Sequence, residues 1–132
     1  MYIYIYPLDE NLSRHTIRQL VGGGLRAMAL PKAKDVVAAN PVVVFSKSYC
    51  PFCVQVKQLL ADLGATFKAI ELDQEKDGEE VQAALAEWTG QRTVPNVFIG
   101  GNHIGGCDKT TAMNGDGKLV PLLTQAGAVK AS

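Results

Sequence analysis

The sequence has few cysteines, no net charge and no long apolar run. The three cysteines in 132 residues, Cys50, Cys53 and Cys107, are too few and odd in number for the disulfide framework of a small secreted domain. Thirteen basic residues balance thirteen acidic ones, so no bulk field attracts nucleic acid or an anionic membrane. No apolar run approaches the roughly 18–20 residues that a membrane-spanning helix needs. We therefore expect a reducing compartment, the cytoplasm, and no nucleic-acid or membrane partner.

The chain changes character at the triple glycine at residues 22–24, a sequence typical of a flexible joint. We interpret residues 1–27 as an N-terminal extension or an artificial leader that carries no chemistry and that can be disordered. Residues 28–132 have a self-consistent globular pattern, and the total length suits one domain with one core. The sequence therefore predicts a single domain over residues 28–132.

Helical and strand-like patterns alternate from Met28 onward. Apolar residues at helical spacing predict helices, and short β-branched or alternating runs predict strands. The expected elements are a helix ending before Pro41, a strand at 41–45, a helix at 51–63, a strand at 67–72, a helix around 81–88, strands at 95–99 and 102–104, and a helix pair ending near Ala126. This order predicts an α/β domain with a mixed four-stranded sheet and helices on both faces.

The segment Cys50-Pro51-Phe52-Cys53 joins the first strand to the following helix. Proline suits the first helical position because its missing N–H would be unpaired there anyway. Cys50 is then the N-cap, and its sulfur faces unpaired backbone N–H groups and the positive end of the helix dipole. Both favour the thiolate, and Lys47 nearby adds a positive charge. The pattern predicts a nucleophilic thiolate at Cys50.

Cys53 follows one helical turn after Cys50 and nearer the interior, so it is placed to resolve a mixed disulfide by attacking Cys50. A free thiol is only a few per cent thiolate at neutral pH, whereas C-x-x-C thiols at helix ends have pKa values of roughly 3.5–7.5. A thiol of low pKa is also a good leaving group, which suits reversible exchange. The pair therefore indicates thiol–disulfide chemistry.

A zinc site is an alternative use of the same cysteines. One C-x-x-C supplies two ligands, and structural zinc usually takes four. His103 and Cys107 could complete the set, but their glycine-rich spacing and the helix start at Pro51 argue against it. We expect no metal.

Two further segments could bind an extended, carboxylated ligand. Thr93-Val94-Pro95 opens the third strand, and a cis Val94–Pro95 bond would present Val94's backbone groups to a peptide. Gly105-Gly106-Cys107-Asp108 precedes another helix, where Asp108 is a suitable N-cap and the glycines allow close approach to backbone N–H groups. Alone, each segment is also compatible with a purely structural role.

Taken together, Cys50-Pro51-Phe52-Cys53, Thr93-Val94-Pro95 and Gly105-Gly106-Cys107-Asp108 resemble the glutaredoxins. The run from Thr89 to Ile99 looks like that of the plant dithiol members. The resemblance extends over about residues 28–128. It implies a thioredoxin fold, a cis peptide bond before Pro95, and glutathione-dependent reduction of protein disulfides and protein–glutathione mixed disulfides by a monomer, with glutathione as reducing co-substrate.

The resemblance also implies roles for individual residues. Cys50 would be the nucleophile and Cys53 the resolving thiol. The glycine carboxylate of glutathione would be bound by Lys47, Gln82 and Arg92. The cysteinyl backbone would be framed by Thr93, Val94 and Pro95, with Phe52 as a stacking surface. The γ-glutamyl end would meet Cys107 and Asp108.

Two positions depart from the family's usual pattern. Phe52 stands where tyrosine is commoner, so a phenolic hydroxyl is missing while the stacking surface remains. Lys109 stands where many relatives carry a second acid that meets the ammonium group of glutathione. The affinity for glutathione is therefore expected to be lower.

Two other functions remain open on the sequence. In the first, Cys50 from two subunits and two glutathiones would hold a [2Fe–2S] cluster, although relatives that do so usually lack proline at the position of Pro51. The second is a thioredoxin-like general reductase, but Tyr49 replaces the tryptophan found before the first cysteine in that family. Both are kept as alternatives to the exchange enzyme.

Overall fold

The computed structural model describes residues 27–130. All but the last residue of the leader expected at residues 1–27 therefore lies outside the described part. The described chain starts within a helix over residues 27–39, called here the N-terminal helix. The elements after it are β1 (Val42–Ser46), α2 (Pro51–Asp62), β2 (Lys68–Glu71), the 3₁₀ helix η1 (Leu72–Gln74), α3 (Gly78–Thr89), β3 (Asn96–Ile99), β4 (Asn102–Gly105), α4 (Cys107–Gly115) and α5 (Leu119–Gln125).

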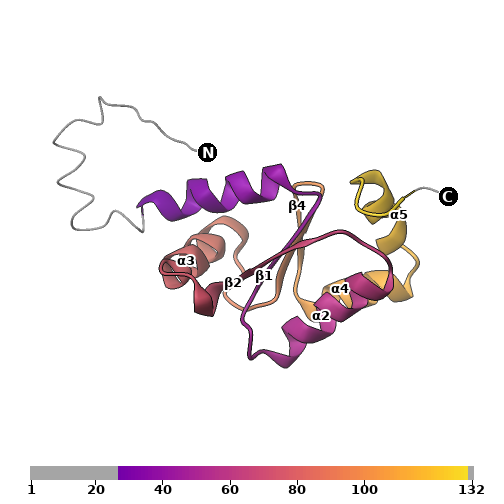
Figure 1. The fold of residues 1–132 in the computed structure, drawn as a ribbon, viewed down its shortest axis with the longest axis horizontal. Helices are drawn as coiled ribbons and strands as arrows, with labels where there is room; N and C mark the ends of the chain where they lie inside the picture. The colour runs from indigo at the N-terminus through magenta and orange to yellow at the C-terminus, as the bar shows by residue number, and fades with distance from the viewer. Residues whose placement is uncertain (1–26, 131–132) are drawn as a thin grey trace.

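The four strands form one mixed sheet in the order β2-β1-β3-β4 (Figure 1). β1 pairs with β2 in parallel and with β3 in antiparallel orientation, and β3 pairs with β4 in antiparallel orientation. The parallel strands β1 and β2 are connected through α2, because parallel neighbours need a crossover connection. The antiparallel strands β3 and β4 form a hairpin. The predicted mixed sheet with helices on both faces is confirmed.

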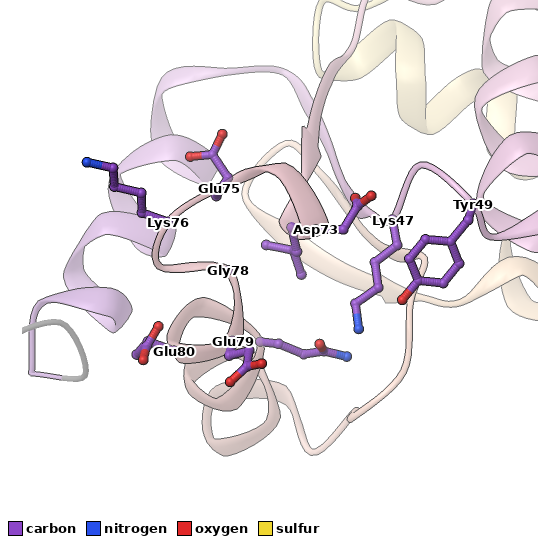
Figure 2. A pocket seen from close by; sticks show the side chains of 10 residues that line it. Lys47, Tyr49, Asp73, Glu75, Lys76, Gly78, Glu79 and Glu80 are labelled. Atoms are coloured by element: carbon purple, nitrogen blue, oxygen red, sulfur yellow. The ribbon is translucent and has the colours of Figure 1, made fainter.

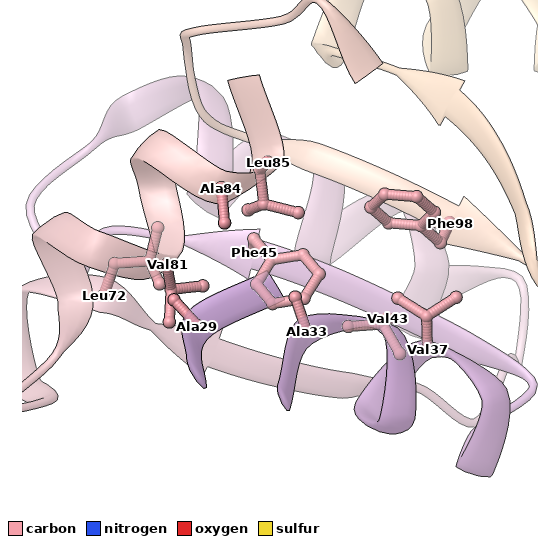
Figure 3. Close-up of a cluster of buried hydrophobic side chains, with 10 residues drawn as sticks. All are labelled: Ala29, Ala33, Val37, Val43, Phe45, Leu72, Val81, Ala84, Leu85 and Phe98. Atoms are coloured by element: carbon pink, nitrogen blue, oxygen red, sulfur yellow. The ribbon is translucent and has the colours of Figure 1, made fainter. Parts of the chain in front are cut away.

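Strand β1 separates two apolar cores because successive side chains point to opposite faces of a sheet. Val43 and Phe45 face the N-terminal helix and α3, together with Phe98 of β3 (Figure 3). Val42 and Val44 face the other layer, which α2, α4 and α5 cover. All five residues of β1 are buried, which explains its continuous run of apolar residues. The end of β1, and hence the loop to α2, is held firmly from both sides.

Two local features differ from the sequence prediction. The 3₁₀ helix η1 (Leu72–Gln74) was not expected, and it packs closely on the start of α3. A Cβ at Gly78 would lie 1.8 Å from the carbonyl oxygen of Leu72, so only glycine fits there. The prediction of Asp108 as an N-cap is wrong. Gly106 is the N-cap of α4 and Asp108 lies inside the first turn, because the chain enters the helix through Gly105 at φ +133°.

Within the residues that the structure describes, none of the helices combines the length and the apolar character that a bilayer crossing requires.

Candidate active site

Cys50 is the N-cap of α2, as the sequence predicted. Its backbone is extended, at φ −87° and ψ 119°, and Pro51 follows in the first turn. The backbone N–H of Cys53 donates to Sγ of Cys50 over 3.3 Å. On the other side, Sγ lies 3.9 Å from the carbonyl oxygen of Val94. The sulfur therefore sits between the start of α2 and the loop before β3, which contains the cis Val94–Pro95 bond.

The local hydrogen bonds favour the thiolate of Cys50. Burial acts to raise the pKa of the Cys50 thiol, but a hydrogen bond from the side chain of Cys53 and the backbone N–H groups of Cys53 and Phe52 outweigh it. The pKa is lowered overall, with a further contribution from the cation of Lys57. The sequence suggested Lys47 for this charge. Lys57 acts instead because it lies on α2 itself, one turn beyond Cys53.

Cys53 has the opposite character. Its side chain is fully buried, and burial together with the hydrogen bond to Cys50 raises the pKa of the Cys53 thiol to about 11. It is therefore a protonated thiol at neutral pH. The site contains one sulfur ready to attack and one that reacts only after Cys50 has become part of a disulfide.

Asp73 anchors the loop that leads to Cys50, a role that the sequence analysis missed. The backbone N–H of Ser48 donates to Oδ1 of Asp73 over 2.9 Å, and the Ser48 hydroxyl donates to Oδ2. These hydrogen bonds lower the pKa of the Asp73 carboxyl. The loop closes on itself where the N–H of Cys50 donates to the carbonyl of Lys47 over 3.1 Å. The η1 segment therefore helps to position Cys50, although it lies more than twenty residues later in the sequence.

A second anchor lies beneath the loop. The hydroxyl of Ser46, at the end of β1, donates to Oε1 of Glu71 over 2.7 Å, and Lys57 pairs with Oε2 of the same carboxylate over 2.7 Å. Both side chains of the ion pair are about one-fifth exposed. Glu71 thereby holds the cation of Lys57 on the side of α2 that carries Cys50.

Lys47 and Gln82, two of the residues expected at the glycine end of glutathione, line one pocket. The pocket has a volume of about 460 Å³. It lies between the loop before α2 and the start of α3, and Figure 2 shows Lys47 and Tyr49 extending into it opposite Glu79 and Glu80. The Gln82 amide donates to the carbonyl of Arg92 over 3.0 Å, which joins α3 to the loop before β3. The other residues that line the pocket are Leu72, Asp73, Glu75, Lys76 and Gly78.

The remaining predicted residues lie in three further segments. Thr93 and Val94 belong to the loop that faces Sγ, with Thr93 exposed and Val94 half-buried. Phe52 is 58% exposed and presents its ring at the start of α2. Cys107 is buried in the core with its Sγ 3.9 Å from the Thr111 hydroxyl, so a ligand can reach only its backbone. Asp108 is exposed in the first turn of α4.

The structure does not bring together the four residues considered as zinc ligands. His103 packs on Phe98 and its Nε2 lies 2.8 Å from Oδ1 of Asn96, whereas Cys107 belongs to the core on the other face of the sheet. Across residues 27–130, there is no group of three or more His, Cys, Asp or Glu side chains arranged to hold a metal ion. The donors needed to complete a zinc site with the cysteine pair lie apart.

A thiolate at a helix start, backed by a buried thiol one turn later, defines a thiol–disulfide exchange centre, and the surrounding sheet and helices are those of the thioredoxin fold. Residues 42–104 match the family model described as Glutaredoxin. A glutaredoxin of Solanum lycopersicum is 74% identical over 102 residues, covering 77% of this chain and 94% of that protein. Glutaredoxin-C6 of Oryza sativa subsp. japonica is 74% identical over 105 residues, covering 80% and 94%.

Solved structures agree with these relatives. The crystal structure of the buckwheat glutaredoxin–glutathione complex superposes with a TM-score of 0.79 at 60% identity, covering 80% of this chain and 96% of that one. The protein belongs to the glutaredoxin family. It is accordingly a glutathione-dependent thiol–disulfide oxidoreductase.

Proposed function

We propose that the enzyme reduces protein–glutathione mixed disulfides by an exchange that needs Cys50 alone, and uses Cys53 for disulfides within proteins. The observation that carries this proposal is the asymmetry of the two thiols. Cys50 accepts a backbone hydrogen bond and its pKa is lowered, whereas Cys53 is buried and its pKa is raised to about 11. Cys50 is therefore the thiol of the pair that ionises more readily.

The exchange has two steps that balance. The Cys50 thiolate attacks the glutathione sulfur of the mixed disulfide, so that the substrate's S–S bond breaks and the protein leaves as a thiolate that takes a proton from water. The thiolate of a second glutathione then attacks the glutathione sulfur bound to Cys50. Glutathione disulfide leaves and the Cys50 thiolate is restored. A leaving thiol of low pKa speeds this second step.

The glutathione moiety would lie across three segments. Lys47, Gln82 and Arg92 supply a cationic and polar end for the glycine carboxylate. Thr93, Val94 and Pro95 frame the cysteinyl backbone beside Phe52, and the backbone at Cys107 and Asp108 meets the γ-glutamyl end. This arrangement is supported by the loop at residues 93–95, which faces Sγ of Cys50, and by the pocket that Lys47 and Gln82 line. It is supported further by the buckwheat relative, which was solved as a glutathione complex.

A single subunit contains every residue in this scheme, so we propose that the enzyme acts as a monomer on glutathionylated or disulfide-bonded proteins. The cluster-carrier alternative would need Cys50 from two subunits. Anaerobic purification followed by sedimentation and visible spectroscopy distinguishes the exchange enzyme from the cluster carrier. A colourless monomer agrees with the exchange enzyme, and a brown dimer with broad visible absorption contradicts it.

The mechanism is tested with Cys50→Ser and Cys53→Ser in a glutathione-coupled assay on a glutathionylated peptide. Loss of Cys50 is expected to abolish turnover, because the other two described thiols, Cys53 and Cys107, are buried. Loss of Cys53 is expected to leave deglutathionylation in place and to remove reduction of disulfides within proteins. Equal activity of the two variants on the glutathionylated peptide would refute the mechanism.

A further inference from the structure

We propose that Gln91 is a positioning residue, which holds the loop at residues 93–95 against Cys50 so that the glutathione moiety of a substrate is seated for attack. This inference rests on the proposed function, because the loop matters only if it binds that moiety. Gln91 was not among the residues that the sequence singled out. Its carboxamide makes a set of contacts that no other described side chain makes with this loop.

The tip of Gln91 ties the loop on both sides of Val94. Nε2 donates to the carbonyl oxygen of Thr93 over 2.9 Å and to that of Pro95 over 2.9 Å. An amide nitrogen carries two N–H donors, and carbonyl oxygens only accept, so both donors are used and the orientation of the amide is determined. Val94, whose own carbonyl lies 3.9 Å from Sγ of Cys50, is held between these two attachment points.

The base of Gln91 is anchored as well. Its backbone N–H donates to the hydroxyl of Thr89 over 3.1 Å, and that hydroxyl donates to the carbonyl of Leu85 over 2.8 Å. Gly90 ends α3 in the left-handed conformation at φ +81°, which turns the chain back toward the loop. The side chain therefore transmits the position of α3, a rigid element, to a loop that lacks regular structure.

Gln91 also faces the second proposed binding segment. A Cβ at Gly106 would lie 3.7 Å from Nε2 of Gln91 and 3.5 Å from the carbonyl of Pro95, and one at Gly105 would lie 3.9 Å from Oε1. The carboxamide thus lies between the loop at 93–95 and the start of α4. These are the segments assigned to the cysteinyl backbone and the γ-glutamyl end. One side chain therefore lies beside both.

The expected consequence is selective. Removing the two hydrogen bonds frees the loop but leaves the start of α2 and its bonds to Cys50 unchanged. Attack on a disulfide that contains glutathione should slow, because the reacting atoms are no longer held in line. Attack on a disulfide without glutathione should not, because nothing has to be seated on the loop.

The test compares Gln91→Met, which keeps the length but has no donor, with Gln91→Glu, which turns two donors into acceptors facing carbonyls. Gln125→Met and Gln125→Glu at the exposed end of α5 are matched controls. Single-turnover rates of the reduced enzyme are measured with a glutathionylated peptide and with 2-hydroxyethyl disulfide. For Gln91→Met we expect the first rate to fall about tenfold, and for Gln91→Glu further. The rate with 2-hydroxyethyl disulfide should change less than about twofold in either Gln91 variant.

A pH series gives a second readout that a folding defect would not produce. As pH falls toward 5, the carboxyl of the Gln91→Glu variant gains a proton and one donor returns, so its deficit relative to the parent should shrink. Equal slowing with both disulfides, or rates matching the Gln125 controls, would overturn the role of Gln91. If the parent itself did not prefer the glutathionylated peptide, the proposed function would fail instead.

Discussion

The backbone N–H of Cys53 points at Sγ of Cys50 across 3.3 Å, and it does so because Cys50 is the residue immediately before a helix. The two thiols therefore differ in acidity although only two residues lie between them. Burial raises the pKa of Cys53 to about 11, whereas hydrogen bonds outweigh burial at Cys50 and lower its pKa. This difference determines which thiol attacks.

The pH dependence of alkylation should show this difference directly. Thiolate, not thiol, reacts with iodoacetamide, so the rate at Cys50 should rise with pH through a pKa below that of a free cysteine. Cys53 should stay unmodified until far higher pH. Mass spectrometry of the alkylated peptides after brief exposure at each pH measures both. Reaction of both cysteines in the same pH range would contradict the assignment.

Replacing Lys57 should raise the pKa of Cys50, because the positive charge of Lys57 favours the thiolate. The Lys57→Gln variant is expected to shift the alkylation profile of Cys50 to higher pH. Lys47→Gln is the matched comparison, and it should weaken use of glutathione while leaving the profile of Cys50 nearer to that of the parent. A larger shift for Lys47→Gln than for Lys57→Gln would restore the interpretation suggested by the sequence.

His103 should make the fold less stable in mild acid. The residue is exposed overall, but the part of its ring that packs on Phe98 is desolvated, which lowers the pKa of its imidazole below the ordinary value of about 6.5. The unfolded chain then takes up a proton more readily than the folded one. The contribution of neutral His103 to the free energy of unfolding is therefore complete above about pH 6.5, and it is lost as pH falls toward the pKa of His103 in the folded chain. In His103→Gln, the free energy of unfolding from urea titrations should decline less between about pH 6.5 and 5. Parallel pH curves for parent and variant would contradict this.

Gly78 should not tolerate a methyl group. A Cβ there would lie 1.8 Å from the backbone oxygen of Leu72, so either η1 or α3 must move. We expect Gly78→Ala to lower the free energy of unfolding by about 3 kcal/mol or more. Gly115→Ala is the matched control, since a Cβ at Gly115 meets nothing within 4 Å, and it should be stabilising by about 0.4–1 kcal/mol. Chemical denaturation compares the two, and equal effects would refute the steric argument.

Phe98 is the centre of the core beneath α3. Its ring stacks on Trp88 at 4.9 Å between centroids and meets Phe45 edge-on at 5.8 Å. Phe98→Ala should lower the free energy of unfolding by about 3–5 kcal/mol, because a large buried ring leaves a cavity. Val120→Ala, at a side chain that is 40% exposed, should change it by less than about 0.5 kcal/mol. A loss under about 1 kcal/mol for Phe98→Ala would show that the core collapses around the missing ring.

The sequence alone was sufficient for the order of elements and the place of the nucleophile. A helix that begins at Pro51 makes Cys50 its N-cap through local backbone preferences, which need no knowledge of distant residues. The buried strand at residues 42–46 and the end of α3 at Gly90 could be predicted for the same reason. The prediction of Asp108 as an N-cap failed because Gly105 takes a backbone conformation that the pattern of side chains does not reveal.

What only the tertiary structure decided is which side chains meet and on which face of the sheet each one lies. Ser48 meets Asp73, Lys57 meets Glu71, and His103 and Cys107 lie on opposite faces of the sheet although four positions separate them. Gln91 reaches its partners only because the chain turns at Gly90 and the loop folds back over it. Local preferences are short-range and visible in sequence, whereas these pairings depend on how the sheet and its helices pack.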